Sequence, residues 1–255
     1  MNVLKTILIA GIALLGATFA QAAGLENMTD AEREIFRAEV RAYLLDEPEV
    51  ILDAIQVLEQ REAQSEAQSD LNLVLANFEE LTRDGYSWVG GNPDGAITIV
   101  EFSDYLCPFC KRAYPEIKIL LENNDDVRFI LKEFPILGPD STLASEAAIS
   151  VLINQGSEMY EAFHDSLMTN NGPMNIKVLS RLLKGVGGDV DLMLEHMDDE
   201  IVAQMIAKNQ ALASRMNISG TPSFLIGTEM LRGFAPASAM QNFVDRARSQ
   251  LEQSR

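Results

Sequence analysis

The feature of the sequence that most constrains the fold is the position of its two cysteines. Cys107 and Cys110 lie three positions apart in the segment CPFC. The residues just before them, 96–102, read AITIVEF and are typical of a buried strand, because they are apolar and rich in β-branched side chains. Residues 111–124 favour a helix, although Pro115 should kink it. The sequence therefore predicts a cysteine pair at the junction of a strand and a helix.

A cysteine pair at this spacing has three uses. As a structural disulfide it would close a four-residue loop, which contributes only about 2 kcal/mol, whereas a fifteen-residue loop contributes about 3 kcal/mol. As a zinc site it lacks partners, because the sequence has no second C-x-x-C and its two histidines, His164 and His196, lie far along the chain without ligand spacing. We interpret both histidines as surface or capping residues. A two-thiolate Cu(I) site remains open.

Thiol–disulfide exchange accounts for more of the pattern. Unsatisfied N–H groups and the helix dipole favour a thiolate at a helix N-terminus. Pro108 occupies the first helical position, where proline is tolerated. We therefore expect Cys107 to be the exposed nucleophile that attacks a disulfide in another protein. Cys110, one helical turn further and more buried, is expected to resolve the mixed disulfide.

The first residues carry the pattern of a secretory signal peptide. One positive charge, Lys5, precedes an apolar run from Ile7 to Phe19, and a small-x-small site ends at Ala22. The apolar run is shorter than the roughly 20 residues that a transmembrane helix needs. We predict that residues 1–22 are removed after export to an oxidising compartment such as the bacterial periplasm, where a dithiol can have redox work.

The charge balance argues against one class of partner. The chain has 38 acidic and 20 basic side chains, which gives a formal net charge of −18. Nucleic-acid binding needs clustered lysine and arginine, so we expect no nucleic acid as a partner. We attribute the acidity to solubility.

Residues 23–62 differ in pattern from the rest of the chain. Apolar residues recur at helical spacing on either side of Pro48, and Thr29 or Asp30 is placed as a helix N-cap. Two short amphipathic helices cannot bury their apolar stripes alone. They must pack on the main domain or on copies of themselves.

A helical linker is predicted next, over residues 63–90. The polar stretch 60–72 has no apolar stripe, a further helix is expected from Leu71 to Leu81, and a turn-rich segment ends the linker. Residues 91–255 then form the main domain.

Within the main domain, strands and helices alternate. A second strand is predicted in VRFILKEFPIL, residues 127–137, with alternating sides. Several helices follow over about 139–216, the last of them from Asp189 to Met216. Two short strands on either side of Gly227 and a closing helix that starts at Pro236 complete the domain. The order βαβ, helical insert, ββα predicts an α/β layer architecture.

The segments EFSDYLCPFC and GTPSFLIG, with the final helix, resemble the thioredoxin fold of the DsbA family, including its helical insertion. The resemblance covers residues 96–252. It implies a cis bond between Thr221 and Pro222 that faces the dithiol, and a Thr221 backbone that pairs with a bound substrate strand. It also implies that Glu101 is a buried acid that takes protons from the resolving cysteine. Lys132 resembles the basic partner of this acid.

Three features bear on the direction of exchange. Phe109 stands where strongly oxidising family members have histidine, and a phenyl ring offers no charge or hydrogen bond to a thiolate, which implies a weaker oxidant. Phe109 also offers apolar surface to unfolded substrates. The threonine at position 221, just before the proline, resembles the residue found there in the isomerase and reductase branches of the family. The segment YLLDEPEVILDAIQVLEQRE is similar to the N-terminal oligomerisation segment of ScsC-type (suppressor of copper sensitivity) proteins, which commonly form trimers.

Together these patterns lead to one leading hypothesis. The chain is expected to be a periplasmic thiol–disulfide oxidoreductase that acts as a disulfide isomerase or reductase on misoxidised client proteins. Its expected partners are disulfide-containing clients, a membrane redox partner that resets the dithiol, and copies of itself, with a trimer favoured. No cofactor and no metal are expected at the site. The alternatives are a monomeric DsbA-like dithiol oxidase and a Cu(I)-binding copper-tolerance protein.

Overall fold

The structure is a computed structural model, and it describes residues 28–253 of the chain. The predicted signal peptide, residues 1–22, lies outside the described residues. The chain divides into two compact units, one that ends at Gln60 and one that begins at Arg61. Among the described helices, none combines the length and the apolar character needed to cross a membrane.

The N-terminal unit contains α1 (Asp30–Asp46) and the first part of α2 (Glu49–Ala76). Thr29 is the N-cap of α1. Its side chain accepts a hydrogen bond from the backbone of Glu32 at 3.3 Å, and the Glu32 carboxylate accepts one from the backbone of Thr29 at 2.8 Å. This reciprocal capping box confirms the predicted helix start. No residue of α1 is buried.

The linker is more regular than the sequence predicted. Helix α2 runs unbroken to Ala76, so the polar stretch is helical, as expected of a helical linker, but the expected start of a separate helix at Leu71 is wrong. The polar stretch is rich in alanine, glutamine and glutamate, which are strong helix formers, and no glycine or proline interrupts it. The helix ends where the Asn77 side chain donates to the carbonyl of Leu73 at 2.8 Å, and the short α3 (Phe78–Thr82) follows.

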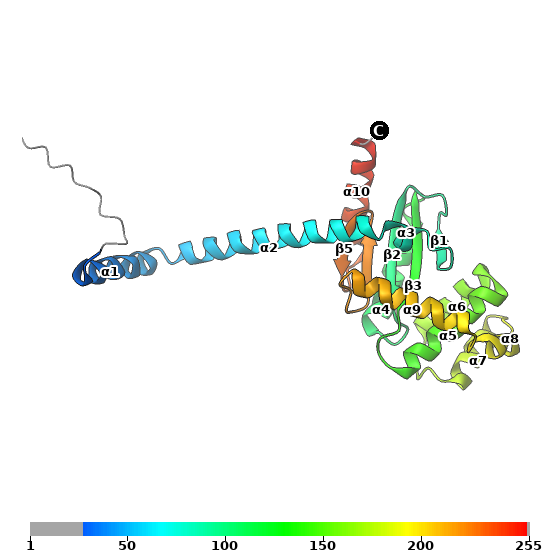
Figure 1. Ribbon diagram of the computed structural model, residues 1–255. Helices are drawn as coiled ribbons and strands as arrows, with labels where there is room; N and C mark the ends of the chain where they lie inside the picture. The colour runs from blue at the N-terminus through cyan, green and yellow to red at the C-terminus, as the bar shows by residue number, and fades with distance from the viewer. Residues whose placement is uncertain (1–27, 254–255) are drawn as a thin grey trace, which may run out of the picture. The chain divides into compact units, whose positions relative to one another are not determined.

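A five-stranded mixed sheet forms the centre of the larger unit (Figure 1). Its strands are β1 (Trp88–Gly91), β2 (Ile97–Ser103), β3 (Val127–Glu133), β4 (Ser223–Ile226) and β5 (Glu229–Arg232). The order across the sheet is β1-β3-β2-β4-β5, and β2 and β3 are parallel while the other neighbours are antiparallel. Strand β1 lies in the segment that the sequence predicted as turns, because its pairing with β3 is a tertiary contact that no local pattern reveals.

Helices surround this sheet. They are α4 (Pro108–Glu122), α5 (Pro139–Gln155), α6 (Ser157–Thr169), α7 (Ile176–Gly185), α8 (Val190–His196), α9 (Glu200–Arg215) and α10 (Ala237–Gln253). Helices α5 to α9 lie between β3 and β4 in the chain, so the predicted thioredoxin fold with a helical insertion is confirmed. Helix α4 continues through Pro115.

One predicted helix of the insertion is two. The helix expected from Asp189 to Met216 breaks between α8 and α9. Asp199 has extended backbone angles there, and its carboxylate lies 2.9 Å from Nδ1 of His196. This contact closes the turn between the helices and accounts for His196 as a local structural residue.

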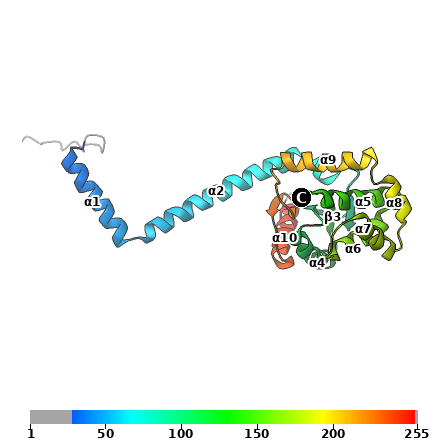
Figure 2. The ribbon, with the colours of Figure 1, turned by 90° about the horizontal axis from the view of Figure 1, so that it is seen from below.

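The sheet is covered on both faces, and Figure 2 shows α9 on one side of it with α4 and α6 on the other. The α4 face buries apolar side chains such as Ile99 and Phe129, and the α9 face buries others such as Val100 and Ile130. The side chains of β3 that alternate between the two faces of the sheet are therefore buried on both faces, and neither face is open to solvent. Sheets covered by helices on both faces bury both sides of their strands.

Lys132 is placed differently from the sequence prediction. The register pairs Glu101 with Leu131 and Lys132 with Phe102, so the acid and the lysine point to opposite faces of the sheet. The fully buried Lys132 forms an ion pair with Asp84 and donates to the carbonyl of Glu80 at 2.8 Å. The prediction that Lys132 is the partner of Glu101 is wrong, because register decides which face each side chain occupies.

The buried pair of Lys132 and Asp84 predicts a large effect on stability. Asp84→Ala leaves a buried ammonium without its counter-ion, and we expect the free energy of unfolding to fall by about 3 to 5 kcal/mol. Urea unfolding of the full chain measures it. The control is Arg83→Ala, which removes an exposed pair with Glu79 and should change stability by less than about 0.5 kcal/mol.

A double variant separates the charge from the shape of the site. Adding Lys132→Met to Asp84→Ala removes the unpaired ammonium and should restore much of the lost stability. If Asp84→Ala lowers the free energy of unfolding by no more than Arg83→Ala does, the buried pair does not stabilise this face of the sheet.

Candidate functional site

The loop between β2 and α4 is fixed by one carboxylate. Oδ1 of Asp104 accepts hydrogen bonds from the backbone N–H of Leu106 and from the Ser141 hydroxyl, both at 2.8 Å. Oδ2 accepts from the backbone N–H groups of residues 136–137, at 2.8 and 3.1 Å. Asp104 therefore ties the residues just before Cys107 to the segment that enters the helical insertion. Asp104 is not among the predicted site residues, although it lies three residues before Cys107.

The two cysteines lie at the N-terminus of α4. Cys107 is the N-cap, with extended backbone angles, and Pro108 begins the helix. Both cysteines are free thiols. Cys107 is only 4% exposed, so the expectation of an exposed nucleophile is wrong, whereas Cys110 is fully buried as expected. The side chain that reaches solvent at this corner is that of Phe109, which is 55% exposed.

The segment before β4 lies against the nucleophile. The Cys107 sulfur lies 3.1 Å from the backbone carbonyl oxygen of Thr221, to which its protonated form donates a hydrogen bond, and this contact joins two segments far apart in the sequence. The peptide bond between Thr221 and Pro222 is cis, as the resemblance implied. The contact explains why Cys107 is covered: the backbone that faces the dithiol lies directly on its sulfur.

The two thiols have opposite electrostatic environments. Hydrogen bonds to the Cys107 sulfur, first from the Cys110 thiol and then from neighbouring groups that include the backbone N–H of Phe109, lower the pKa of Cys107 to about 5. Burial raises the pKa of Cys110 above its ordinary value. At neutral pH the site therefore holds a thiolate at Cys107 and a proton at Cys110.

Glu101 lies buried beneath the dithiol. Burial raises its pKa to about 8, so the side chain is largely protonated at neutral pH. Its Oε1, like Oγ of Ser103 on the same face of β2, is a buried polar atom of the described residues without a hydrogen-bond partner. Glu101 interacts electrostatically with Cys110. An acid in this place can exchange a proton with the buried thiol.

Next to the site lies a buried polar cluster that the sequence analysis missed. Glu133 accepts hydrogen bonds from the hydroxyls of Tyr105 and Tyr160, at 2.7 and 2.5 Å, and from that of Ser145 at 2.7 Å. Nδ1 of His164 lies 3.1 Å from the Tyr105 hydroxyl. His164 is thus buried and not a surface or capping residue. The signal available in the sequence was Tyr105, two residues before the dithiol.

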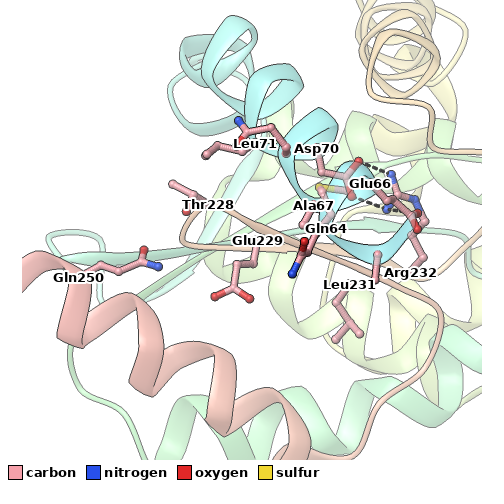
Figure 3. A pocket seen from close by; sticks show the side chains of 13 residues that line it. Gln64, Glu66, Ala67, Asp70, Leu71, Thr228, Glu229, Leu231, Arg232 and Gln250 are labelled. Carbon is pink, nitrogen blue, oxygen red and sulfur yellow. Dashed lines mark hydrogen bonds and ion pairs between the residues drawn. The ribbon is translucent and has the colours of Figure 1, made fainter. Parts of the chain in front are cut away.

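A groove of about 750 Å³ lies elsewhere in the larger unit (Figure 3). It runs between the second half of α2, the edge strand β5 and the side chain of Gln250. Arg232 on its wall makes two hydrogen bonds to the Asp70 carboxylate, both at 2.7 Å. No residue of the dithiol site lines this groove, so it is a separate feature of the surface.

Two protein families match separate parts of the chain. The DSBA-like thioredoxin domain matches residues 98–246, which is more than half of the chain. The copper resistance protein ScsC N-terminal domain matches residues 32–65, which cover most of α1 and the first part of α2.

The curated relatives differ in the fraction of their own length that aligns with this chain. The Na(+)/H(+) antiporter NhaA 3 of Salinispora tropica is 30% identical over 140 residues, which are 54% of this chain and 21% of the antiporter. The chain thus spans about a fifth of the antiporter. Disulfide bond formation protein D of Bacillus subtilis is 25% identical over 169 residues, with 61% of this chain and 74% of that protein covered.

Solved structures share the fold over most of their length. A thioredoxin-like oxidoreductase from Silicibacter pomeroyi has a TM-score of 0.64 and 38% identity, with 67% of this chain and 97% of that chain covered. Proteus mirabilis ScsC in a transitional conformation has a TM-score of 0.65 and 25% identity, with 88% and 100% covered. BcfH of Salmonella enterica Typhimurium has a TM-score of 0.70 and 27% identity, with 85% and 96% covered.

The family match includes the strand that leads to the dithiol, the dithiol itself, the helical insertion and the cis-proline segment. The chain therefore belongs to the DsbA-like thioredoxin family of thiol–disulfide oxidoreductases, and it carries an ScsC-type N-terminal domain.

Proposed function

We propose that this protein is a periplasmic disulfide isomerase or reductase in which Cys107 attacks client disulfides and Cys110 resolves the mixed disulfide. The observation that carries the proposal is the contrast between the two thiols. The pKa of Cys107 is lowered to about 5, while burial raises that of Cys110. A thiolate is the nucleophile in exchange, so only Cys107 is ready to attack at neutral pH.

The exchange step uses four sulfur atoms. The Cys107 thiolate forms a bond to one client sulfur, and the client disulfide breaks to release the other sulfur as a thiolate. In isomerisation a different client thiolate attacks the client sulfur of the mixed disulfide, which forms a new client disulfide and frees Cys107 as a thiolate, with no net change in oxidation state. In reduction Cys110 attacks Cys107 instead, its proton passes to Glu101, and the client leaves reduced while the dithiol becomes a disulfide.

The client must first reach a covered sulfur. Because the Thr221 carbonyl lies on Cys107, an extended client segment that pairs with the Thr221 backbone would take the place of this contact. Phe109 offers an exposed ring beside it, which adds apolar contact without demanding a particular client sequence. The absence of a polar group at Phe109 also leaves the thiolate without stabilisation from that side chain.

The N-terminal unit supports an assembly of several copies, with a trimer favoured. Its helices expose many large apolar side chains. They are Ile35, Phe36, Val40, Tyr43, Leu45, Ile51, Leu52, Ile55, Val57 and Leu58. Such a surface is stabilised when copies cover it. Several dithiols held on one assembly raise the effective concentration of attacking thiolate at one misfolded client, which favours isomerisation.

Location and recycling complete the proposal. The signal-peptide pattern of residues 1–22 supports a periplasmic location for the mature protein, where disulfides persist. A dithiol that becomes oxidised during reduction needs electrons to return to its active state, so a membrane thiol–disulfide partner is expected to reset it.

A second candidate, a dithiol oxidase, is favoured by one observation. A Cys107 pKa of about 5 stabilises the reduced form of the dithiol, and such stabilisation makes the disulfide form a stronger oxidant. The relative from Bacillus subtilis is named for disulfide bond formation. The two candidates share the same residues and differ in the redox state in which the protein works.

The first prediction from the proposed function concerns the titration of Cys107. Ultraviolet absorbance of the thiolate in the reduced protein should show a midpoint near pH 5, and Cys107→Ser should lose it. Because the folded pKa lies below the unfolded value of about 8.5, this group stabilises the reduced fold fully above that value. The contribution declines as the pH falls and is lost through pH 5. A midpoint near the unfolded value would contradict the proposed nucleophile.

The second prediction separates isomerase from oxidase. The reduced protein should restore activity to scrambled ribonuclease without added oxidant, because a single thiolate at Cys107 suffices for reshuffling. Cys107→Ala should abolish the reaction, whereas Cys110→Ala should keep part of it and accumulate mixed disulfide. If the wild type oxidises reduced ribonuclease but never reshuffles the scrambled form, the protein is a dithiol oxidase and the isomerase proposal is wrong.

The third prediction concerns assembly. Deletion of residues 25–62 should convert an oligomer to a monomer, as measured by light scattering. Val40→Asp, which puts a charge into the apolar stripe of α1, should weaken the assembly. Ala38→Asp is the matched control, since it adds the same charge on the opposite side of the helix, and it should leave the mass unchanged. If the number of subunits stays the same after the deletion, the N-terminal unit is not what holds the assembly together.

A further inference from the structure

Two buried carboxylates share one face of the sheet. The register pairs Ser103 of β2 with Glu133 of β3, and Glu101 lies two positions before Ser103 on the same face. Ideal strand spacing separates the Cα atoms of Glu101 and Glu133 by roughly 8 Å. Both residues are buried. Like charges this close in the interior oppose each other's ionisation.

Glu133 is equipped to carry a charge there. Its carboxylate accepts three hydroxyl hydrogen bonds, from Tyr105, from Tyr160 of α6 and from Ser145 of α5. Asn209 of α9 donates to its backbone carbonyl at 3.0 Å. Hydrogen bonds to a carboxylate favour its ionised form and oppose the cost of burial, and the pKa of Glu133 is raised only to about 7.

The hydrogen bonds also fix the proton positions in the cluster. Tyr105 has one hydroxyl proton and donates it to Glu133, so at the 3.1 Å contact with His164 the imidazole Nδ1–H must be the donor. If Glu133 takes up a proton, the chain reverses: Glu133 donates to Tyr105, and Tyr105 donates to Nδ1. Burial lowers the pKa of His164 to about 4, so the ring is neutral in both states. The charge of the cluster is therefore the charge of Glu133.

Glu101 has the opposite surroundings. Its Oε1 has no hydrogen-bond partner among the described residues, and Ser103 is the one neighbour whose interaction lowers its pKa. The charged groups that act on it are the Cys107 thiolate and Glu133, both anionic. Lys132, the nearest buried cation in the sequence, lies on the other face of the sheet. As the pH rises, Glu133 ionises first and Glu101 follows near pH 8.

We propose that Glu133 is a positioning residue whose negative charge adds to the effect of burial in holding the proton on Glu101, and so delays transfer of the Cys110 proton to Glu101. The inference rests on the proposed exchange function. In the delayed step the Cys110 proton moves to the Glu101 carboxylate and the Cys110 sulfur bonds to the Cys107 sulfur. The bond between Cys107 and the client breaks, and the client leaves as a thiolate.

The consequence is a longer-lived mixed disulfide. While Glu101 keeps its proton, Cys110 has no buried base and cannot readily resolve the bond at Cys107. A client thiolate then has time to attack this bond, which returns Cys107 and completes isomerisation. Glu133 thus favours isomerisation of a client over its reduction.

A single-turnover reaction with dithiodipyridine tests this in the full mature chain. Attack by Cys107 releases the first thiopyridone, and resolution by Cys110 releases the second, so the two steps give separate phases. In the wild type the rate of the second phase should rise with pH as Glu101 ionises. Its midpoint should lie below the pKa of about 8 that Glu101 has beside the Cys107 thiolate, because Cys107 carries no charge in the mixed disulfide. Glu133→Gln should lower this midpoint by about one pH unit, with the first phase unchanged.

Two further variants complete the test. Tyr160→Phe removes one donor to Glu133, makes its ionised form less favourable and should shift the midpoint in the same direction by less. If Glu133→Gln does not fold, the Tyr160→Phe variant alone tests the proposal. Glu79→Gln removes the same formal charge from the exposed surface and should shift nothing.

The outcomes are distinct. A second-phase midpoint that stays at the wild-type pH in Glu133→Gln and Tyr160→Phe, with an intact first phase, overturns the role of Glu133. An equal shift in Glu79→Gln also overturns it, since the effect would then be one of net charge. If the wild type shows no first phase, Cys107 is not the nucleophile. The proposed function then fails, and this result differs from an unshifted second phase.

Discussion

The hydrogen bonds accepted by the Asp104 carboxylate are the constraint on which the site depends. They join the end of β2 to the segment that leads from β3 into α5. Without them the loop before α4 would lose four hydrogen bonds that fix its path toward Cys107, the N-cap of that helix. The lowered pKa of Cys107 requires backbone N–H groups and a neighbouring thiol in fixed places. The electrostatics of the dithiol thus begin with a carboxylate that never touches a sulfur atom.

The sheet separates charges by register. On its α9 face, Lys132 is neutralised by Asp84 and contributes to stability. On its α4 face, Glu101 and Glu133 lie among tyrosines, a serine and the two thiols, and the register places Lys132 away from them. An ion pair between Lys132 and Glu101 would have lowered the pKa of the acid and made it a permanent carboxylate. Their separation is what leaves Glu101 able to hold or accept a proton near neutral pH.

The sequence revealed the features that are local. The strand, the CPFC motif and the helix after it occupy adjacent positions, so apolar pattern and cap chemistry sufficed to predict them. The cis bond before Pro222 came from family resemblance, since a threonine–proline pair alone indicates only a turn. Strand β1, the burial of Cys107 under Thr221 and the cluster around Glu133 were out of reach. Each joins segments far apart in the chain, and no periodicity encodes such a contact.

The lowered pKa of Cys107 has two effects in exchange that act in opposite directions on the proposed role. It supplies the attacking thiolate, and it also makes Cys107 a good leaving group, so that a mixed disulfide is broken easily by whichever thiolate attacks it first. The outcome then depends on competition between the buried Cys110 and the thiolates of the client. With the pKa of Cys110 raised by burial and Glu101 protonated, the internal competitor is slow. Under the proposed function, the same environment that would make the dithiol oxidising lets a reduced dithiol act as a reshuffling catalyst, and the redox state of the pair decides which activity is expressed.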